Sequence, residues 1–213
     1  MTEDEGFVIN IRNSGNRYYL KILLKDSGFK EFVVYGLKSG KKSFYPILTP
    51  IHLINFQIEK DKILDAILLN EYVDLKKELK KIDLIMKSYT LLDKLPFIES
   101  YNSTCFFHLL RKFENFISKN RLIHNTKIYY SLFLRYLVYC LGIDISINDL
   151  ISSYGSIFSK FDSAKPKLVE KFCNLYNSKI DDLADYIDNP EVDYDYLINL
   201  LKNHIFVHLN IKI

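Results

Sequence analysis

The residues that decide the fold of this chain are Arg17-Tyr18-Tyr19-Leu20-Lys21-Ile22-Leu23-Leu24-Lys25. Every even position from Tyr18 to Leu24 is apolar or aromatic, whereas the odd positions hold three cations, Tyr19 and one aliphatic exception, Leu23. Because successive side chains of a β-strand point to opposite faces, this alternation predicts a strand with one face in a core and the other in water.

The same alternation recurs on both sides of this segment. The residues expected on one face are Phe7, Ile9 and Ile11 in the first stretch, and His52, Ile54, Phe56 and Ile58 in the second. The segments Asn13–Asn16 and Asp26–Gly28 supply turn residues. Glycine accepts positive φ at little cost, so these segments predict tight turns between antiparallel strands.

The predicted strands are Phe7–Arg12, Arg17–Lys25, Phe29–Gly36, Ile51–Ile58 and Ile63–Leu69. A basic loop, Leu37–Ser43, lies between the third and fourth of them. Five strands and one long basic loop predict an OB-type β-barrel over residues 1–74, a fold that binds single strands on one open face. An SH3-like barrel is the alternative that the pattern leaves open.

After Asp74 the apolar period changes from two to 3.6. A helical stripe is predicted from Leu75, Leu79, Ile82, Ile85, Met86, Tyr89 and Leu92, and Pro96 ends it. Further helices are predicted near residues 106–117, 128–141, 167–176, 181–187 and 194–209, with Gly142 ending the 128–141 helix. The predicted fold class is therefore α+β, with a five-stranded OB-type barrel at 1–74 and an α-helical bundle at 75–213.

Charge is distributed unevenly along the 213 residues, although the net charge is only +3. The stretch Gly6–Ile58 carries eight Lys/Arg and two acids, whereas Asp181–Asp195 carries seven acids and no Lys or Arg. The first stretch would attract phosphate and the second would repel it, unless each is simply a solvated face.

The cysteine positions and the N-terminal residues both predict a cytoplasmic location. The three cysteines are Cys105, Cys140 and Cys173, which lie far apart, and the acidic start Met1–Glu5 does not resemble a secretory signal. The most apolar run, Ile128–Ile143, is interrupted by Arg135 and is too short to span a bilayer. A cytoplasmic, nucleoid-associated protein with reduced cysteines and no membrane partner is expected.

No motif predicts an enzyme, a metal site or a cofactor. The segment Gly36–Ser43 has three residues between its glycines and Lys42 where a phosphate-binding loop needs a hydroxyl. His204 with His208, and Cys105 with His108, are pairs at helical spacing, but two ligands do not make a zinc site.

Aromatic and basic residues are interleaved in the N-terminal stretch. This combination suits single-stranded nucleic acid, because bases stack on rings while cations hold the phosphates. The predicted phosphate contacts are Arg12, Arg17, Lys21, Lys38, Lys41 and Lys42, and the predicted stacking residues are Tyr35 and Tyr45. A basic surface without a ligand is the alternative.

Five segments, in the same order along the chain, resemble the bacterial recombination mediator family RecO. The segment Glu5–Asn16 resembles the family's opening strand, and Val34–Ser43 is similar to its third strand and basic loop. Leu48-x-Pro50 resembles the family's L-x-P motif, and the segment 133–143 resembles its helix that ends in L-G. His208–Lys212 resembles the family's C-terminal H-L-G-x-K motif, with Asn210 in place of Gly.

The resemblance implies an OB-fold N-terminal domain, a helical C-terminal domain and no enzymatic turnover. It implies DNA repair and recombination through binding of single- and double-stranded DNA, and annealing of strands coated by single-strand-binding protein (SSB). It also implies cooperation with RecR in loading RecA. The family's four-cysteine zinc module has no counterpart between Asp144 and Ala164, so a metal-free loop is expected there. The residues expected near the acidic, apolar SSB tail are Lys119, Arg121, Lys127 and Arg135.

Two other classes of function stay open at this point. An RNA-binding OB protein would use the same stacking and phosphate contacts. A protein–protein scaffold would bind peptides on the barrel and a basic partner on the acidic stretch Asp181–Asp195.

Overall fold

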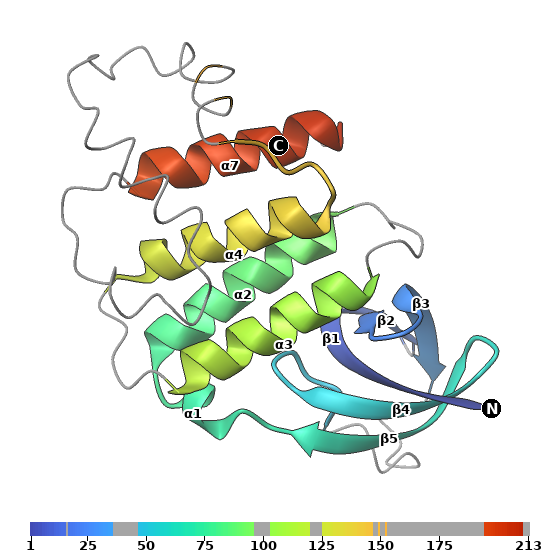
Figure 1. Cartoon of the computed structure of the whole chain (residues 1–213). Helices are drawn as coiled ribbons and strands as arrows, with labels where there is room; N and C mark the ends of the chain where they lie inside the picture. Colours follow the sequence, from blue (N-terminus) through green and yellow to red (C-terminus); the bar gives the residue numbers. More distant parts are fainter. Residues whose placement is uncertain are drawn as a thin grey trace. The chain divides into compact units, whose positions relative to one another are not determined.

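The computed structural model of the chain describes residues 1–15, 17–35, 47–95, 103–119, 125–146, 149, 152 and 194–210 (Figure 1). The chain divides into two compact units, Met1–Arg121 and Leu122–Ile213. The first unit contains a β-sheet and three helices, and the second contains two described helices. The boundary predicted at residue 74 therefore differs from the division in the structure, which keeps three helices with the sheet.

The first unit is built on one antiparallel sheet with the strand order β3-β2-β1-β4-β5. The strands are β1 (Thr2–Ser14), β2 (Arg17–Leu24), β3 (Gly28–Tyr35), β4 (Leu53–Glu59) and β5 (Lys62–Asn70). Strand β1 is shared between two half-sheets, because its first part pairs with β4 and its second part with β2. The predicted α+β class and all five predicted strands are confirmed.

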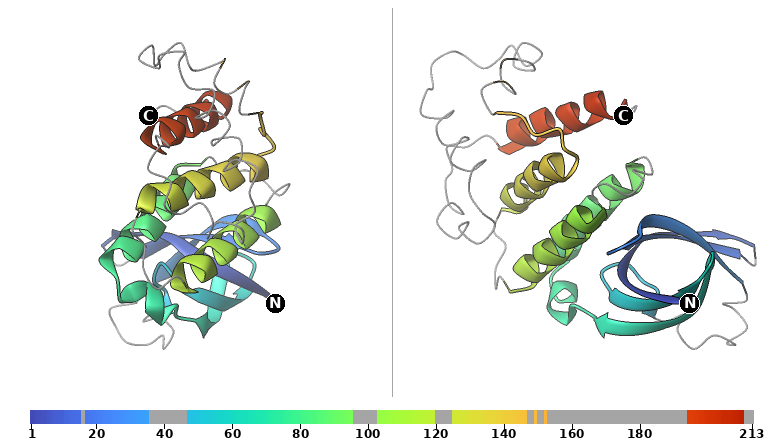
Figure 2. Two further views of the ribbon diagram at one scale, coloured as in Figure 1. Left: turned by 60° about the vertical axis from the view of Figure 1, so that its left-hand side comes forward. Right: turned by 45° about the vertical axis from the view of Figure 1, so that its right-hand side comes forward.

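The sheet is curved but it is not a closed barrel. In Figure 2 it bends round so that β3 and β5 approach each other. Each of these two edge strands pairs with one neighbour, β3 with β2 and β5 with β4, and the described residues form no ladder between them. The prediction of a barrel is thus confirmed only as a curved, open five-stranded sheet.

The concave face of the sheet holds the hydrophobic core. Tyr18, Leu20, Ile22 and Leu24 all lie in this core, as the alternation predicted. The other members are Val8, Phe32, Val34, Leu48, Ile54, Phe56, Ile58, Ile63 and Ala66. Period-two alternation therefore identified the buried face of β2 and β4 correctly.

The predicted face of β1 is wrong because the strand carries a β-bulge. The pairing of β1 with β2 shifts register between Val8 and Asn10, so one residue is inserted and the side-chain parity changes. Val8 and Ile11 face the core, whereas Phe7 lies on the outer face with its ring 5.4 Å from that of Phe107.

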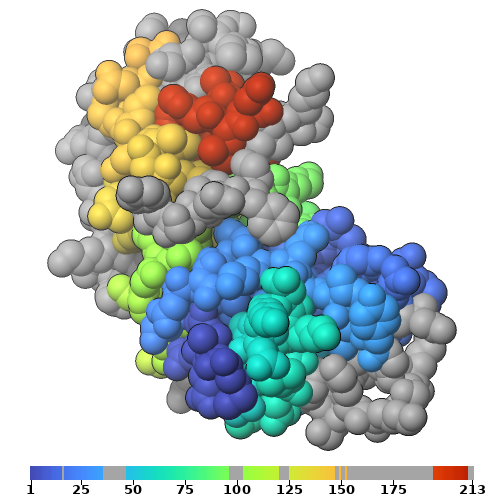
Figure 3. All heavy atoms as spheres, turned by 90° about the vertical axis from the view of Figure 1, so that its right-hand side faces the viewer, coloured from blue at the N-terminus to red at the C-terminus, as the bar shows by residue number. Residues whose placement is uncertain are grey.

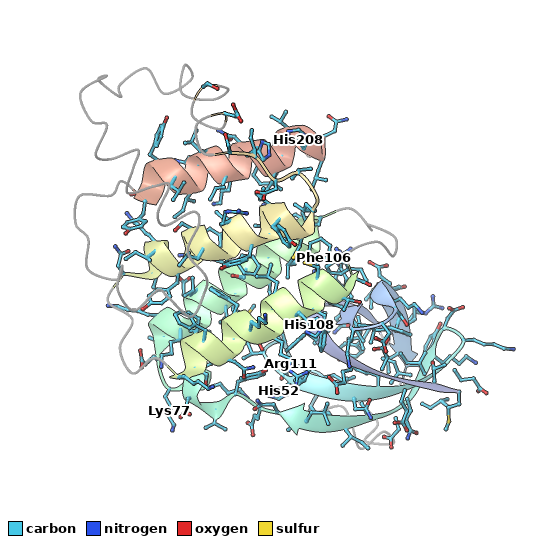
Figure 4. All side chains as sticks on the ribbon, viewed as in Figure 1. His52, Lys77, Phe106, His108, Arg111 and His208 are labelled. Atoms are coloured by element: carbon cyan, nitrogen blue, oxygen red, sulfur yellow. The ribbon has the colours of Figure 1, made fainter. Side chains whose placement is uncertain are left out.

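Two helices, α2 (Leu79–Lys94) and α3 (Ser103–Lys119), cover part of the outer face of the sheet, and the short α1 (Val73–Lys76) packs against both of them (Figures 1 and 2). Phe106 of α3, which is labelled in Figure 4, packs against Phe29 of β3, with ring centroids 6.0 Å apart. Arg111 of α3 forms an ion pair with Glu5 of β1 at 3.4 Å. Contacts of α2 with β1 and of α3 with β2 and β3 fix the helices on this face.

The buried face of α2 is rotated from the predicted stripe. Ile85, Tyr89 and Leu92 are buried as predicted, but Leu79 and Met86 are exposed. Leu79 is the first residue of the helix, and Leu84, Ser88 and Leu91 lie on the buried side instead.

The second unit contains α4 (Thr126–Cys140) and α7 (Tyr194–His208), which pack against each other. Helix α4 is buried on most of its surface, and Gly142 follows it with φ +69°. The helices predicted near 167–176 and 181–187 lie outside the described residues, as do most of the acidic stretch 181–195 and of the loop 144–164.

In the part of the chain that the structure describes, no helix is both long enough and apolar enough to cross a membrane. Cys105 and Cys140 are both disulfide-bonded. The expectation of reduced cysteines does not match this state of Cys105 and Cys140.

Candidate nucleic-acid interface

The outer face of β1, β2 and β3 changes character from one end to the other. Residues directly opposite each other on neighbouring antiparallel strands share a face. From the helix-covered end outward, the cross-strand rows on this face are Phe7–Leu23–Phe29, Asn10–Lys21–Glu31, Arg12–Tyr19–Val33 and Ser14–Arg17–Tyr35. The face therefore runs from apolar and covered to basic, aromatic and exposed.

The exposed end brings together three of the predicted site residues, Arg12, Arg17 and Tyr35. The Arg12 side chain is 62% exposed and Tyr35 is 58% exposed. Atoms of β3 lie at the molecular surface in Figure 3, where they are light blue. The strand register explains why these three residues share one face.

Arg17 and Tyr35 form a cation–π pair. The guanidinium carbon of Arg17 lies 5.5 Å from the centroid of the Tyr35 ring. The pair places an exposed ring beside a fixed positive charge at the edge of the sheet. A base stacked on such a ring would have its phosphate within reach of a cation.

Lys21 is placed differently from the other predicted phosphate contacts, because it is buried. Its Nζ donates hydrogen bonds to the main-chain oxygens of Asp93, at 2.6 Å, and Leu95, at 3.4 Å. Burial lowers the pKa of this ammonium, while the Asp93 carboxylate 3.5 Å away acts in the opposite direction. In this position Lys21 serves the packing of α2 on the sheet and does not face an external phosphate.

The remaining predicted DNA contacts lie outside the described residues: Lys38, Lys41, Lys42 and Tyr45. In sequence they follow β3 closely, since β3 ends at Tyr35. The exposed end of the sheet is thus the end from which the basic segment continues.

Two residues of this face were not predicted as part of the site. Tyr19 lies opposite Arg12, and its i, i+2 relation to Arg17 is the signal that could have placed it on the same face. Asp93 reaches the face from α2, and no local pattern signals a partner 72 residues from Lys21.

The four residues predicted near an SSB tail differ in their surroundings. Lys119 is exposed at the end of α3, and Arg121 lies outside the described residues. In the second unit Lys127 forms an ion pair with Asp195, and Arg135 forms one with Asp144 at 3.0 Å. Two of the four cations therefore already have carboxylate partners within the chain.

The histidine pair of α7 is accounted for by packing. The rings of His204 and His208 meet edge to face at 4.3 Å, and the His204 Nε2 lies 2.7 Å from the main-chain oxygen of Ile143. Burial lowers the pKa of His204, which favours the neutral ring. Within the described ranges, no group of three or more His, Cys, Asp and Glu residues would hold a metal ion.

These features define an α+β protein whose curved antiparallel sheet presents a basic and aromatic surface beside a helix-covered one. No protein-family model matches the chain, and no curated protein matches it significantly.

Proposed function

We propose that this chain is a RecO-type recombination mediator, a non-enzymatic protein that binds single- and double-stranded DNA and anneals complementary strands. The binding surface is the exposed end of the outer face of β1–β3, together with the basic segment 36–43 that follows it. The observation that carries the proposal is the shared exposed face of Arg12, Arg17 and Tyr35, with Arg17 against the Tyr35 ring.

The shape of the sheet supports an OB-type assignment. OB folds are five-stranded, partly open barrels that bind oligonucleotides on the face of strands 2 and 3 and on the adjoining loops. Here five antiparallel strands curve until β3 and β5 approach, and the exposed cation and ring sit on β2 and β3.

The charge of the surface supports annealing without a catalytic group. Two DNA strands repel each other through their phosphates, and a surface that neutralises both lowers the free energy needed to bring them together. Exposed rings hold unpaired bases until they meet their complements.

The direct test is the binding of a fluorescein-labelled 20-nucleotide oligothymidine, followed by anisotropy over a salt titration. Arg17→Ala should weaken binding and reduce the slope of log K against log salt by about 0.7, the value for one phosphate on single-stranded DNA. The matched control is Lys62→Ala, which removes an exposed cation from β5 and should leave both quantities unchanged. Equal effects of the two variants would remove this face from the site.

Annealing of SSB-coated complementary oligonucleotides, with and without RecR, then tests the mediator role. Equal binding of matched RNA and DNA oligonucleotides would favour an RNA-binding protein, and no nucleic-acid affinity at low salt would favour a scaffold.

The SSB partnership has its own test, calorimetric titration with the SSB tail peptide. Lys119→Glu should weaken that interaction, because Lys119 is an exposed cation whereas Lys127 and Arg135 already pair with acids. Absence of heat with the unmodified protein would contradict the proposed partner.

A further inference from the structure

We propose that Asp93 is a built-in competitor of the DNA phosphate for Arg12, so that an acid from α2 limits the affinity of the β1–β3 face. This inference rests on the proposed function, because it concerns how the same surface is regulated.

The Asp93 carboxylate lies against three polar side chains of the sheet. Its Oδ2 accepts a hydrogen bond from the Asn10 amide at 2.6 Å. Its Oδ1 lies 3.5 Å from the Lys21 ammonium and 3.7 Å from the Arg12 guanidinium, and it has no hydrogen-bond partner among the described residues. The carboxylate thus contacts Asn10 and Lys21, which lie in one cross-strand row, and Arg12, which lies in the next row toward the exposed end.

The position of Asp93 in its own helix is unfavourable. It is the second-to-last residue of α2, where the partial negative charge of the helix end repels a carboxylate. The cations of the sheet offset that repulsion. An acid here is therefore explained by what it meets on the sheet and not by the helix that carries it.

The two cations beside Asp93 differ in their freedom to turn away. Lys21 is held inside the protein by the main-chain oxygens of Asp93 and Leu95, and it also neighbours Glu31. Arg12 is mostly exposed and lies beyond hydrogen-bond distance of the carboxylate. Arg12 is consequently the cation that can leave Asp93 for a phosphate.

DNA binding at this surface then carries a cost, since Arg12 must leave Asp93. Exposed ion pairs of this kind weaken a competing interaction by about two- to fivefold. Removing the acid should give a tighter complex and, because one more cation is available to release a counterion, a steeper salt dependence.

The test compares Asp93→Asn with the unmodified protein in the oligothymidine assay. Asp93→Asn should bind about two- to fivefold more tightly, with the salt slope increased by about 0.7. The gain should vanish in an Arg12→Ala background. Asp61→Asn, which removes an exposed acid at the β4–β5 turn, is the matched control and should change binding little.

A second variant tests whether the gain in affinity comes from the release of Arg12 or from the change in net charge, and it guards against loss of folding. Lys21→Met with Asp93→Asn removes one charge of each sign, so the net charge stays the same and no buried charge is left alone. This double variant should keep the gain in affinity.

The outcomes distinguish the two proposals. Unchanged or weaker binding by folded Asp93→Asn, or a gain that survives Arg12→Ala, overturns the role of Asp93 while the DNA-binding function stands. Absence of binding by both the unmodified protein and Asp93→Asn overturns the proposed function and this inference with it.

Discussion

Lys21 of β2 caps the end of α2 by donating a hydrogen bond to the main-chain oxygen of Asp93, with Nζ and O 2.6 Å apart. The last carbonyls of a helix have no partner within the helix, and a cation near them is favoured by the helix dipole. The same ammonium lies 5.4 Å from the centroid of the Phe29 ring. A residue that looks in sequence like one of several surface lysines is therefore a link between the sheet and a helix.

Replacing Lys21 by methionine should destabilise the first unit by about 3 kcal/mol. The methionine keeps the packing of the stem, but the Asp93 carboxylate loses its buried partner, and breaking such a pair is costly. Urea unfolding followed by circular dichroism measures the effect. Lys62→Met, at an exposed position of β5, should stay within about 0.5 kcal/mol of the unmodified protein. Equal midpoints for the two variants would contradict the capping role.

Gly6 should tolerate alanine less well than Gly15 does. A Cβ at Gly6 would lie 2.9 Å from the main-chain oxygen of Leu23, so β1 and β2 would have to separate where β1 passes between the two half-sheets. We expect Gly6→Ala to cost about 1–3 kcal/mol. At Gly15 the added Cβ meets nothing within 4 Å, and the positive φ of +62° is the only source of strain. A smaller loss at Gly6 than at Gly15 in urea unfolding would refute the close approach.

Tyr35→Ala should weaken oligothymidine binding by roughly 1–3 kcal/mol, whereas Tyr35→Phe should change it little. The ring is exposed and its face is what stacking requires, while no role is assigned to its hydroxyl. The matched control is Tyr139→Ala, which removes an exposed ring in the second unit. A Phe variant as weak as the Ala variant would show that the hydroxyl, and not stacking, is what binds.

The strands were predictable because their side chains obey a rule of short range. Alternation in β2 fixed which residues enter the core, and the turn residues fixed where the strands end. The prediction of which β1 side chains face the core was wrong because one inserted residue near Ile9 changes the alternation. A β-bulge depends on pairing with another strand and not on the sequence of β1 alone.

The outer face was only partly predictable, because its environment is set by distant residues. Arg12, Arg17 and Tyr35 were predicted from the interleaving of basic and aromatic residues, and the register places them on one face. The burial of Lys21 follows from α2, whose packing direction no local pattern specifies. Closure of the barrel could not be predicted either, because it depends on how far the sheet coils. The alternation of apolar and polar residues does not determine that coiling.

A buried carboxyl lies between α2 and α3, away from the proposed interface. Glu114 is fully buried, and its Oε1 accepts a hydrogen bond from the Tyr89 hydroxyl at 2.6 Å. No described residue bonds the Glu114 Oε2. Removal from water raises the pKa of Glu114 to about 8, although the Tyr89 hydrogen bond acts in the opposite direction.

Glu114 should make the first unit less stable as the pH rises. In the unfolded chain this carboxyl loses its proton near its ordinary pKa of 4.5, whereas in the folded protein it keeps the proton up to about pH 8. Between these values the unfolded state binds fewer protons, so the free energy of unfolding should fall with pH, by at most about 1.4 kcal/mol for each pH unit. Urea unfolding at pH 5.5, 6.5, 7.5 and 8.5, four values chosen to bracket about three pH units, measures this slope. Glu114→Gln keeps the acceptor for Tyr89 but does not titrate, so it should remove the slope, and an unchanged slope in that variant would assign the pH dependence to another group.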